Sequence, residues 1–397
     1  MACSRLISVV CQIILTLHVV DAFAAVSPRS KLPPPPCPTS NPSDDVFREI
    51  RRYWPVSLQN WLTENGVFRF LADSLVIFGV PGLIKEYPDA FWDFFHLSTS
   101  SVFKTESDDS SSARLSCRSK LTKIRYGKHK SQFIDLIEPI HGSPEGVVAF
   151  VHGGAWGSGL PWMYRLSALP FLEQNKAVAI LGYRTYPDAD LSGQVSDISN
   201  AVDGLARGRS DLLDDGGRVT ALVGHSSGAH IALLHVLESA KNAMQGASNS
   251  TPIKHYVGIS GVYCISSHYQ FEIGRGVDQI SALRVACGPE DKFQEASPVF
   301  RLERMMGVDS TLSGGEDVPW ILSEDTIPEF SFFHGVQDDV VQYAQTCDMV
   351  DSIRLALRNP SRCSECILDG VGHADTVIHL MVGGATRDAL TKQCQDW

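Results

Sequence analysis

Short apolar runs recur along the chain after residue 145, and they constrain its fold more than any other feature. They are rich in Val, Ile, Ala and Phe, and helical stretches separate them: GVVAFVHG (146–153), AVAILGY (177–183), RVTALVGH (218–225), HYVGIS (255–260), EFSFFHG (329–335) and ECILDG (365–370). Runs without polar alternation are typical of strands covered on both faces. Strands that alternate with helices form βαβ units in a mostly parallel sheet. We therefore predict one α/β domain over 120–397, with a mostly parallel central sheet flanked by helices.

Residues 1–24 have the pattern of a targeting segment. Arg5 gives the segment a positively charged N-terminal region. The apolar stretch at 6–20 that follows is too short, and too interrupted by polar residues, to span a membrane comfortably. The sequence AFA at 22–24 fits a cleavage site. We expect a signal peptide or a retained anchor, and hence the secretory pathway: the ER or Golgi lumen, a membrane-associated form or secretion. A small residue followed by Phe also ends the two-step import signal of algae with complex plastids, so a plastid is the alternative for such a source.

Further segments precede the α/β domain. We expect a Pro-rich spacer at 25–45, a helical, aromatic-rich extension at 46–104 and a polar linker at 105–119. Within the extension, residues 67–84 are apolar enough for peripheral membrane contact, although Asp73 and Pro81 argue against a span. Packing of this segment on the α/β domain is the alternative.

Charge and motif content exclude several functional classes. The net charge of −11 leaves no basic footprint for nucleic acid. No cofactor or metal is expected, since no His-Glu-x-x-His occurs and Gly314-Gly315 lacks the Lys-Ser/Thr of a phosphate loop. The ten cysteines permit disulfides without fixing their connectivity. Cys363 and Cys366 have redox-motif spacing but do not open a helix, so we expect a loop pair.

The segment 220–234, TALVGHSSGAHIALL, places a Gly-x-Ser-x-Gly pentapeptide between a predicted strand and a predicted helix. In this context a sharp turn strains the central serine, and glycines two residues before and after it avoid backbone clashes. Ser226 has both glycines, Gly224 and Gly228, whereas Ser227 does not. We therefore predict that Ser226 is a nucleophile; the alternative is a Gly-rich turn without chemistry.

A loop of small residues, HGGAW at 152–156, follows the predicted strand 147–151. Such a loop lets backbone N–H groups point into a cleft, where they stabilise the oxyanion of a tetrahedral intermediate. By position, we expect the donors to be the N–H groups of Gly154 and Ala155, joined by that of Ser227. A turn with a core tryptophan is the alternative.

Two later strand ends supply an acid and a base. Asp338 follows the His-Gly pair at 334–335 in the loop beyond its strand, where it can orient a histidine; Asp339 is the competing choice. His373 follows a glycine-containing loop and precedes a helix. The order Ser226, Asp338, His373 is the chain order of a nucleophile-elbow hydrolase. We predict that these three act as a catalytic triad through an acyl-enzyme.

With these motifs the chain resembles the α/β-hydrolase superfamily, in the carboxylesterase branch with a His-Gly-Gly-x-Trp loop. More closely it resembles the isoprenylcysteine methylesterases, and the resemblance extends over 124–383. The matching segments are YGKHKSQFIDLIEP, VVAFVHGGAW, GYRTYPDADLSGQVSDISNAV, GHSSGAHIA, GISGVY, HGVQDD and GHADTV. Kynurenine formamidases and feruloyl-esterase-like proteins share many of these motifs.

The closer resemblance implies a small-molecule or lipid-like ester substrate, a methyl ester on a prenylated C-terminal cysteine. It implies an apolar pocket, bordered by Trp156 as a substrate-binding residue and by a cap at 262–285. The expected signal peptide fits this poorly, because prenylated cysteines face the cytosol. An arylformamidase, with polar groups in its pocket, is the first alternative. A catalytically silent receptor or adhesion module is the second, although such modules typically lack a triad residue.

Overall fold

The computed structural model describes residues 119–140, 142–214, 217–246, 251–279, 281–306, 327–394 and 397. The predicted signal segment, spacer and helical extension, including the membrane contact at 67–84, lie outside these residues and stay predictions. The predicted polar linker also lies outside them, apart from Ser119, which begins the first strand. Within the described residues, no helix combines the length and apolar character needed to cross a membrane.

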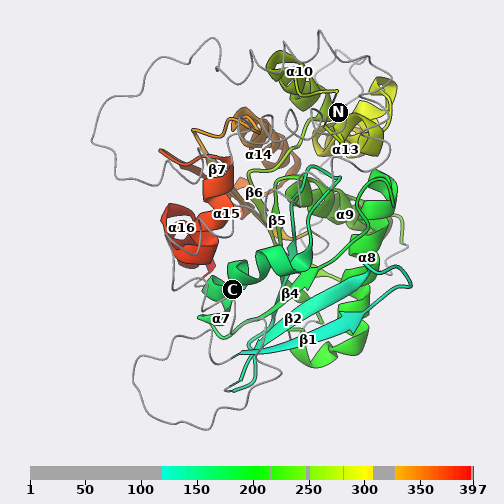
Figure 1. Ribbon diagram of the computed structural model, residues 1–397. Coiled ribbons are helices and arrows are strands. Elements are labelled where there is room, and N and C mark those ends of the chain that lie inside the picture. The colour runs from blue at the N-terminus through cyan, green and yellow to red at the C-terminus, as the bar shows by residue number, and fades with distance from the viewer. Residues whose placement is uncertain are drawn as a thin grey trace, which may run out of the picture.

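One eight-stranded sheet forms the centre of the molecule, in the order β1-β2-β4-β3-β5-β6-β7-β8 (Figure 1). The strands are β1 (Ser119–Arg125), β2 (Phe133–Pro139), β3 (Val147–Val151), β4 (Ala177–Leu181), β5 (Val219–His225), β6 (Ile253–Ile259), β7 (Glu329–Gly335) and β8 (Cys363–Leu368). β1 pairs antiparallel with β2, and β2 antiparallel with β4. All other pairs are parallel. The predicted mostly parallel α/β fold is confirmed.

Helices cover both faces of this sheet. They are η2 (Pro161–Ala168), α7 (Leu169–Leu172), α8 (Leu191–Gly208), η3 (Ser210–Leu212), α9 (Ser227–Met244), α10 (Ile265–Arg275), α11 (Leu283–Cys287), η4 (Glu290–Lys292), α12 (Phe293–Ala296), α13 (Pro298–Met305), α14 (Ala344–Ala356), η5 (Pro360–Arg362), α15 (His373–Val382) and α16 (Ala385–Gln393). Helices α8, α9, α13 and α14 pack into one apolar cluster. Helices η2, α7, α15 and α16 pack into the other.

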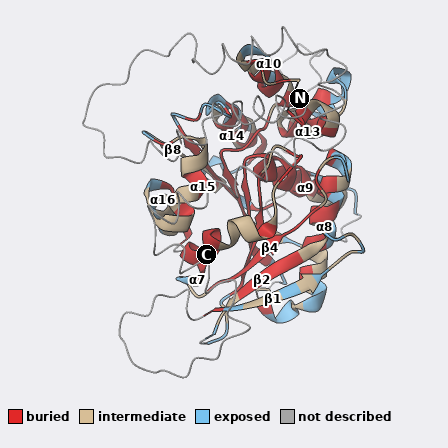
Figure 2. Ribbon diagram, viewed as in Figure 1, coloured by how far each residue is buried: buried red, intermediate tan, exposed pale blue. Residues whose placement is uncertain are grey.

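Every residue of β3, β4 and β5 is buried, as the red strands at the centre of Figure 2 show. Val147 and Ala149 of β3 belong to one cluster, while Val148 and Phe150 belong to the other. Successive side chains of a strand point to opposite faces, so both faces must be apolar. This is why these strands are continuous apolar runs, and the predicted runs all correspond to strands.

The antiparallel edge formed by β1 and β2 was not among the predicted strands. β1 exposes Lys120 and Lys123, so it lacks an apolar run. In β2 a fully buried Asp135 interrupts the apolar residues, and the Arg165 guanidinium donates to its Oδ2 at 2.8 and 2.6 Å. β1 is an edge strand that needs only one apolar face, and the carboxylate of Asp135 divides the apolar run of β2, so both strands have a weaker sequence signal.

The chain after β6 leaves the sheet to form α10, α11, α12 and α13. In Figure 1, α10 and α13 lie beyond the upper ends of β5 and β6. The predicted cap segment at 262–285 therefore includes α10 and the start of α11. The expectation of a loop pair at Cys363 and Cys366 is wrong, because both residues belong to β8, and their thiols are free.

Candidate active site

Ser226 stands at the turn between β5 and α9 with φ 54° and ψ −126°, a strained conformation for a residue other than glycine. The turn is tight on both sides. A Cβ on Gly224 would lie 2.5 Å from Ala229 Cα, and a Cβ on Gly228 would lie 2.3 Å from the Val151 carbonyl oxygen. The predicted strain at the serine and the need for both glycines are confirmed.

A continuous chain of hydrogen bonds joins Ser226, His373 and Asp338. His373 Nε2 lies 3.0 Å from Ser226 Oγ, and His373 Nδ1 lies 2.7 Å from Asp338 Oδ2. Because a carboxylate only accepts, Nδ1 carries the proton and Nε2 is free to accept the serine proton. The competing residue, Asp339, is exposed, whereas Asp338 is buried. The structure brings together the predicted serine, histidine and first-choice acid.

Asp338 is held on both of its oxygens. Oδ1 accepts the N–H groups of Val340 and Val341 at 3.0 and 2.7 Å, and Oδ2 lies 3.1 Å from His334 Nε2. Burial alone raises the pKa of this carboxyl. The nearby His373 and the hydrogen bonds from His334 and His373 outweigh burial and hold the pKa well below its usual range. Asp338 is therefore ionised at neutral pH, as the orienting acid of a triad must be.

The loop at 152–156 lies directly against the nucleophile. A Cβ on Gly153 would be 3.1 Å from Ser226 Cβ. The loop turns through positive φ at Gly154, Ala155 and Trp156, with values of 137°, 48° and 60°. Within the described residues, the N–H groups of Gly154, Ala155 and Ser227 donate to no backbone carbonyl. Their role as an oxyanion hole stays a prediction.

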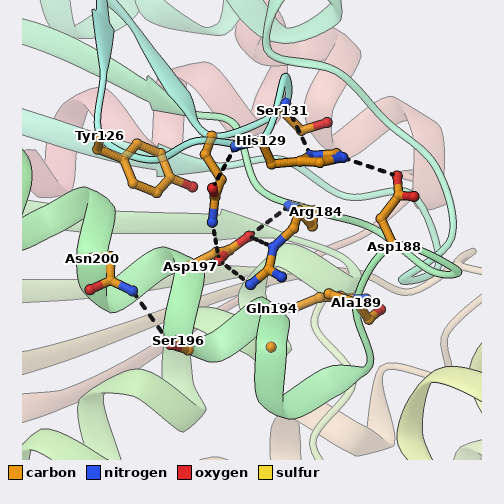
Figure 3. Close-up of polar contacts among 12 residues, drawn as sticks. Tyr126, His129, Ser131, Arg184, Asp188, Ala189, Gln194, Ser196, Asp197 and Asn200 are labelled. Carbon is orange, nitrogen blue, oxygen red and sulfur yellow. Dashed lines mark hydrogen bonds and ion pairs between the residues drawn. The ribbon is translucent and has the colours of Figure 1, made fainter.

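Helix α8 supports this loop, although nothing in the residue pattern of the helix singled it out. The carbonyl of Trp156 accepts the Gln194 side-chain amide at 2.9 Å and the Tyr186 N–H at 2.8 Å. Figure 3 shows the neighbouring anchor, where the Arg184 guanidinium makes a double hydrogen bond with Asp197 of α8 at 2.8 and 2.7 Å. The ion pair fixes the segment after β4, and Gln194 fixes the loop after β3.

Trp156 has only 1% of its surface exposed. Its indole N–H donates to His230 Nδ1 at 2.9 Å, and His230 Nε2 donates to the Ala296 carbonyl at 2.8 Å. Burial lowers the pKa of His230 to about 3, so the imidazole stays a neutral acceptor. The structure gives Trp156 a supporting role under the loop, and its contact with substrate stays a prediction. Among the described residues, no group of three or more His, Cys, Asp or Glu side chains is placed to hold a metal ion.

Known proteins resemble this chain in sequence and fold. The BD-FAE family model matches residues 134–300. The isoprenylcysteine alpha-carbonyl methylesterase of Arabidopsis thaliana is 30% identical over 258 residues, which cover 64% of this chain and 56% of the plant protein. The chain thus spans little more than half the length of this curated relative.

Solved structures share the fold at low identity. Esterase B from Lactobacillus rhamnosis superposes with a TM-score of 0.50 at 18% identity, over 78% of this chain and 96% of that protein. A truncated carbohydrate esterase from gut microbiota superposes with a TM-score of 0.51 at 15% identity, over 73% and 98% of the two chains. The chain therefore shares the fold of these esterases, and its sequence is similar to the BD-FAE family model and to the plant methylesterase.

Proposed function

We propose that the protein is a serine carboxylic-ester hydrolase, with Ser226 as nucleophile, His373 as general base and Asp338 as the acid that orients it. The observation that carries the proposal is the unbroken hydrogen-bond chain from Asp338 through His373 to Ser226, at 2.7 and 3.0 Å. A serine hydroxyl is a weak nucleophile at neutral pH, and an adjacent oriented base activates it. The strained turn at Ser226 holds the hydroxyl in reach of that base.

The reaction follows from these positions. His373 Nε2 takes the Ser226 proton while Oγ bonds to the ester carbonyl carbon, and the carbonyl π electrons move onto oxygen. The N–H groups of Gly154, Ala155 and Ser227 stabilise that oxyanion. When the carbonyl re-forms, the C–O bond to the alcohol breaks and His373 returns the proton to the departing oxygen. Water then attacks the acyl-enzyme with His373 again as base, which releases the acid and restores Ser226.

For the substrate, we propose a lipid-like methyl ester of a prenylated cysteine. The support is the sequence likeness to the Arabidopsis isoprenylcysteine methylesterase, which extends over 258 residues. Passage through the secretory pathway is a separate proposal, which rests on residues 1–24 alone. An arylformamidase remains the alternative, and hydrolysis rates separate the two.

Labelling with a fluorophosphonate probe tests the nucleophile. The wild-type protein should become labelled, and Ser226→Ala should abolish labelling. Ser192→Ala, which removes an exposed hydroxyl on α8, is the matched control and should leave labelling unchanged. An unlabelled wild type, or a labelled Ser226→Ala variant, would overturn the proposal.

A hydrolysis panel on the purified protein tests the substrate. It comprises short and long nitrophenyl esters, a prenylcysteine methyl ester and N-formylkynurenine. The proposal expects the highest kcat/KM for the prenylcysteine ester. A preference for N-formylkynurenine would replace it with the arylformamidase.

A further inference from the structure

A cluster of buried polar side chains occupies the cap. His268 and Glu272 lie one turn apart on α10 and are 4% and 7% exposed, and Ser281 follows in the next loop. Ser281 Oγ donates to Glu272 Oε1 at 2.8 Å, and His268 Nε2 lies 3.7 Å from the same oxygen. Within the described chain, His268 Nδ1 and Glu272 Oε2 are buried and have no hydrogen-bond partner. Buried polar groups are nearly always paired, so two orphaned atoms in one cluster point to a ligand.

The cluster adjoins the active site. The His268 ring lies 6.4 Å from the Trp156 ring, centre to centre, and Trp156 ends the loop beside Ser226. His268 is also near enough to the triad for the charges of His373 and Asp338 to act on its pKa. The position of α10 beyond the ends of β5 and β6 agrees with this placement (Figure 1). A group bound by the cluster would therefore belong to a molecule held at Ser226.

Apart from Arg275, the described groups around the Glu272 carboxylate give it no positively charged partner. Burial, aided by His373 and Arg275, lowers the pKa of His268 to about 3, so the imidazole is neutral. Burial raises the pKa of Glu272 to about 7, against the opposing effects of the Ser281 hydrogen bond and Arg275. The other titratable groups that act on the pair are Cys287 of α11, His230 of α9, and the triad residues His373 and Asp338. Apart from Arg275 on its own helix, none of these supplies Glu272 with a positive partner.

We propose that His268 and Glu272 form a subsite for the primary amino group of an ester substrate bound at Ser226. With Nε2–H turned towards Glu272 Oε1, His268 presents Nδ1 as an acceptor, and Glu272 presents Oε2 as a second acceptor. An amino group offers two or three N–H donors and matches this pair. A hydroxyl offers one donor, and a carboxylate offers none and is repelled by Glu272. The inference rests on the proposed esterase function, because it places the amine on a substrate of that site.

Matched substrates test the subsite at about pH 8, where Glu272 is mostly ionised. One pair is L-phenylalanine methyl ester and methyl 3-phenylpropanoate, which differ by the amine on the acyl side. The second pair is 2-aminoethyl and ethyl 3-phenylpropanoate, which differ by the amine on the alcohol side. We expect the amine to raise kcat/KM at least about tenfold in one of the pairs, the size of one hydrogen bond to a charged group. That preference should shrink below pH 7 as Glu272 takes up a proton.

Glu272→Gln keeps the shape and removes the charge. It should lower the amine preference, the ratio of the two kcat/KM values of a pair, to about threefold or less. Glu295→Gln, an exposed glutamate of α12, is the matched control and should retain the full preference. No amine preference in either wild-type pair, or an undiminished preference in folded Glu272→Gln, overturns the subsite. Failure of the wild type to hydrolyse any of these esters would instead count against the esterase function. If Glu272→Gln does not fold, the wild-type pairs decide alone.

Discussion

Asp338→Asn changes one oxygen of the acid to an amide and leaves the volume of the side chain unchanged. The native Oδ1 accepts two backbone N–H groups, so the new amide keeps its oxygen on that side. Its NH₂ then faces His373 Nδ1, 2.7 Å away in the native protein. Two donors cannot face each other, so His373 must move its proton to Nε2. With Nε2 protonated, the ring cannot take the proton of Ser226.

The same substitution also places the amide against His334 Nε2, which lies 3.1 Å from the native Oδ2. Rotation of the amide would relieve both conflicts, but it would turn the NH₂ towards the Val340 and Val341 N–H groups, which need an acceptor. We expect kcat/KM to fall by about 10⁴-fold, or about 5.4 kcal/mol of transition-state stabilisation, as for the loss of tautomer control in other triads. A nitrophenyl ester assay measures the loss, and the bimolecular rate of fluorophosphonate labelling measures it independently of turnover.

Asp339→Asn is the matched control, since it makes the same chemical change at an exposed neighbour, and it should stay within about twofold of wild type. The reasoning would be refuted if Asp338→Asn kept more than about a tenth of wild-type activity while folded. It would equally be refuted if Asp339→Asn were the variant that lost activity.

Two further predictions concern the loops around the nucleophile. Gly228→Ala should lower the free energy of unfolding by roughly 1–3 kcal/mol and impair labelling of Ser226, because the new Cβ would lie 2.3 Å from the Val151 carbonyl oxygen. Thermal unfolding measures the loss of stability. Gly208→Ala is the control, since its Cβ would meet no atom within 4 Å, and it should be as stable as wild type or more stable. Gln194→Leu should lower kcat roughly tenfold with little change in KM, since it removes a 2.9 Å hydrogen bond to the Trp156 carbonyl and loosens the proposed oxyanion loop. A higher KM at unchanged kcat, measured with a nitrophenyl ester, would contradict this.

Local sequence was enough to predict the buried strands and the positions of Ser226, Asp338 and His373. A fully covered strand must be apolar on both faces, and a nucleophile turn must carry glycine where a Cβ would collide, so each leaves a contiguous pattern. The choice of Asp338 over Asp339 came from spacing, and the structure explains it by burial and by the two N–H groups that hold Oδ1.

Hydrogen bonds between residues far apart in the sequence could not be predicted from local sequence. Gln194 reaches the Trp156 carbonyl from 38 residues away, and His230 reaches the Trp156 indole from 74 residues away. Neither residue type nor local spacing identifies such pairs, because only the packing of α8 and α9 against the sheet brings them together. Trp156 illustrates this: its bond to His230 and its burial under the loop come from packing, and its contact with substrate stays a prediction.

The backbone strain of this protein is concentrated where the chemistry is proposed. In the described residues, the residues other than glycine with positive φ are Ala155, Trp156, Asn175, Ser226 and Ser260. All except Asn175 follow β3, β5 or β6 at the carboxyl edge of the sheet. Each such conformation costs about 1–3 kcal/mol and persists only when its surroundings hold it.

Those surroundings are hydrogen bonds between adjacent strand ends. Ser226 N–H donates to the Ile259 carbonyl at 2.8 Å, and Ser260 N–H donates to the Phe333 carbonyl at 2.8 Å. Ser260 Oγ lies 3.2 Å from Thr376 Oγ1 on α15, the helix that begins with His373. The strained turns at Ser226 and Ser260 are therefore each held by the next strand of the sheet, and the turn at Ser260 also contacts α15, the helix that begins with His373. Because these bonds exist without substrate, the proposed nucleophile and base would need no rearrangement when charge develops, which is the condition for electrostatic stabilisation of a transition state.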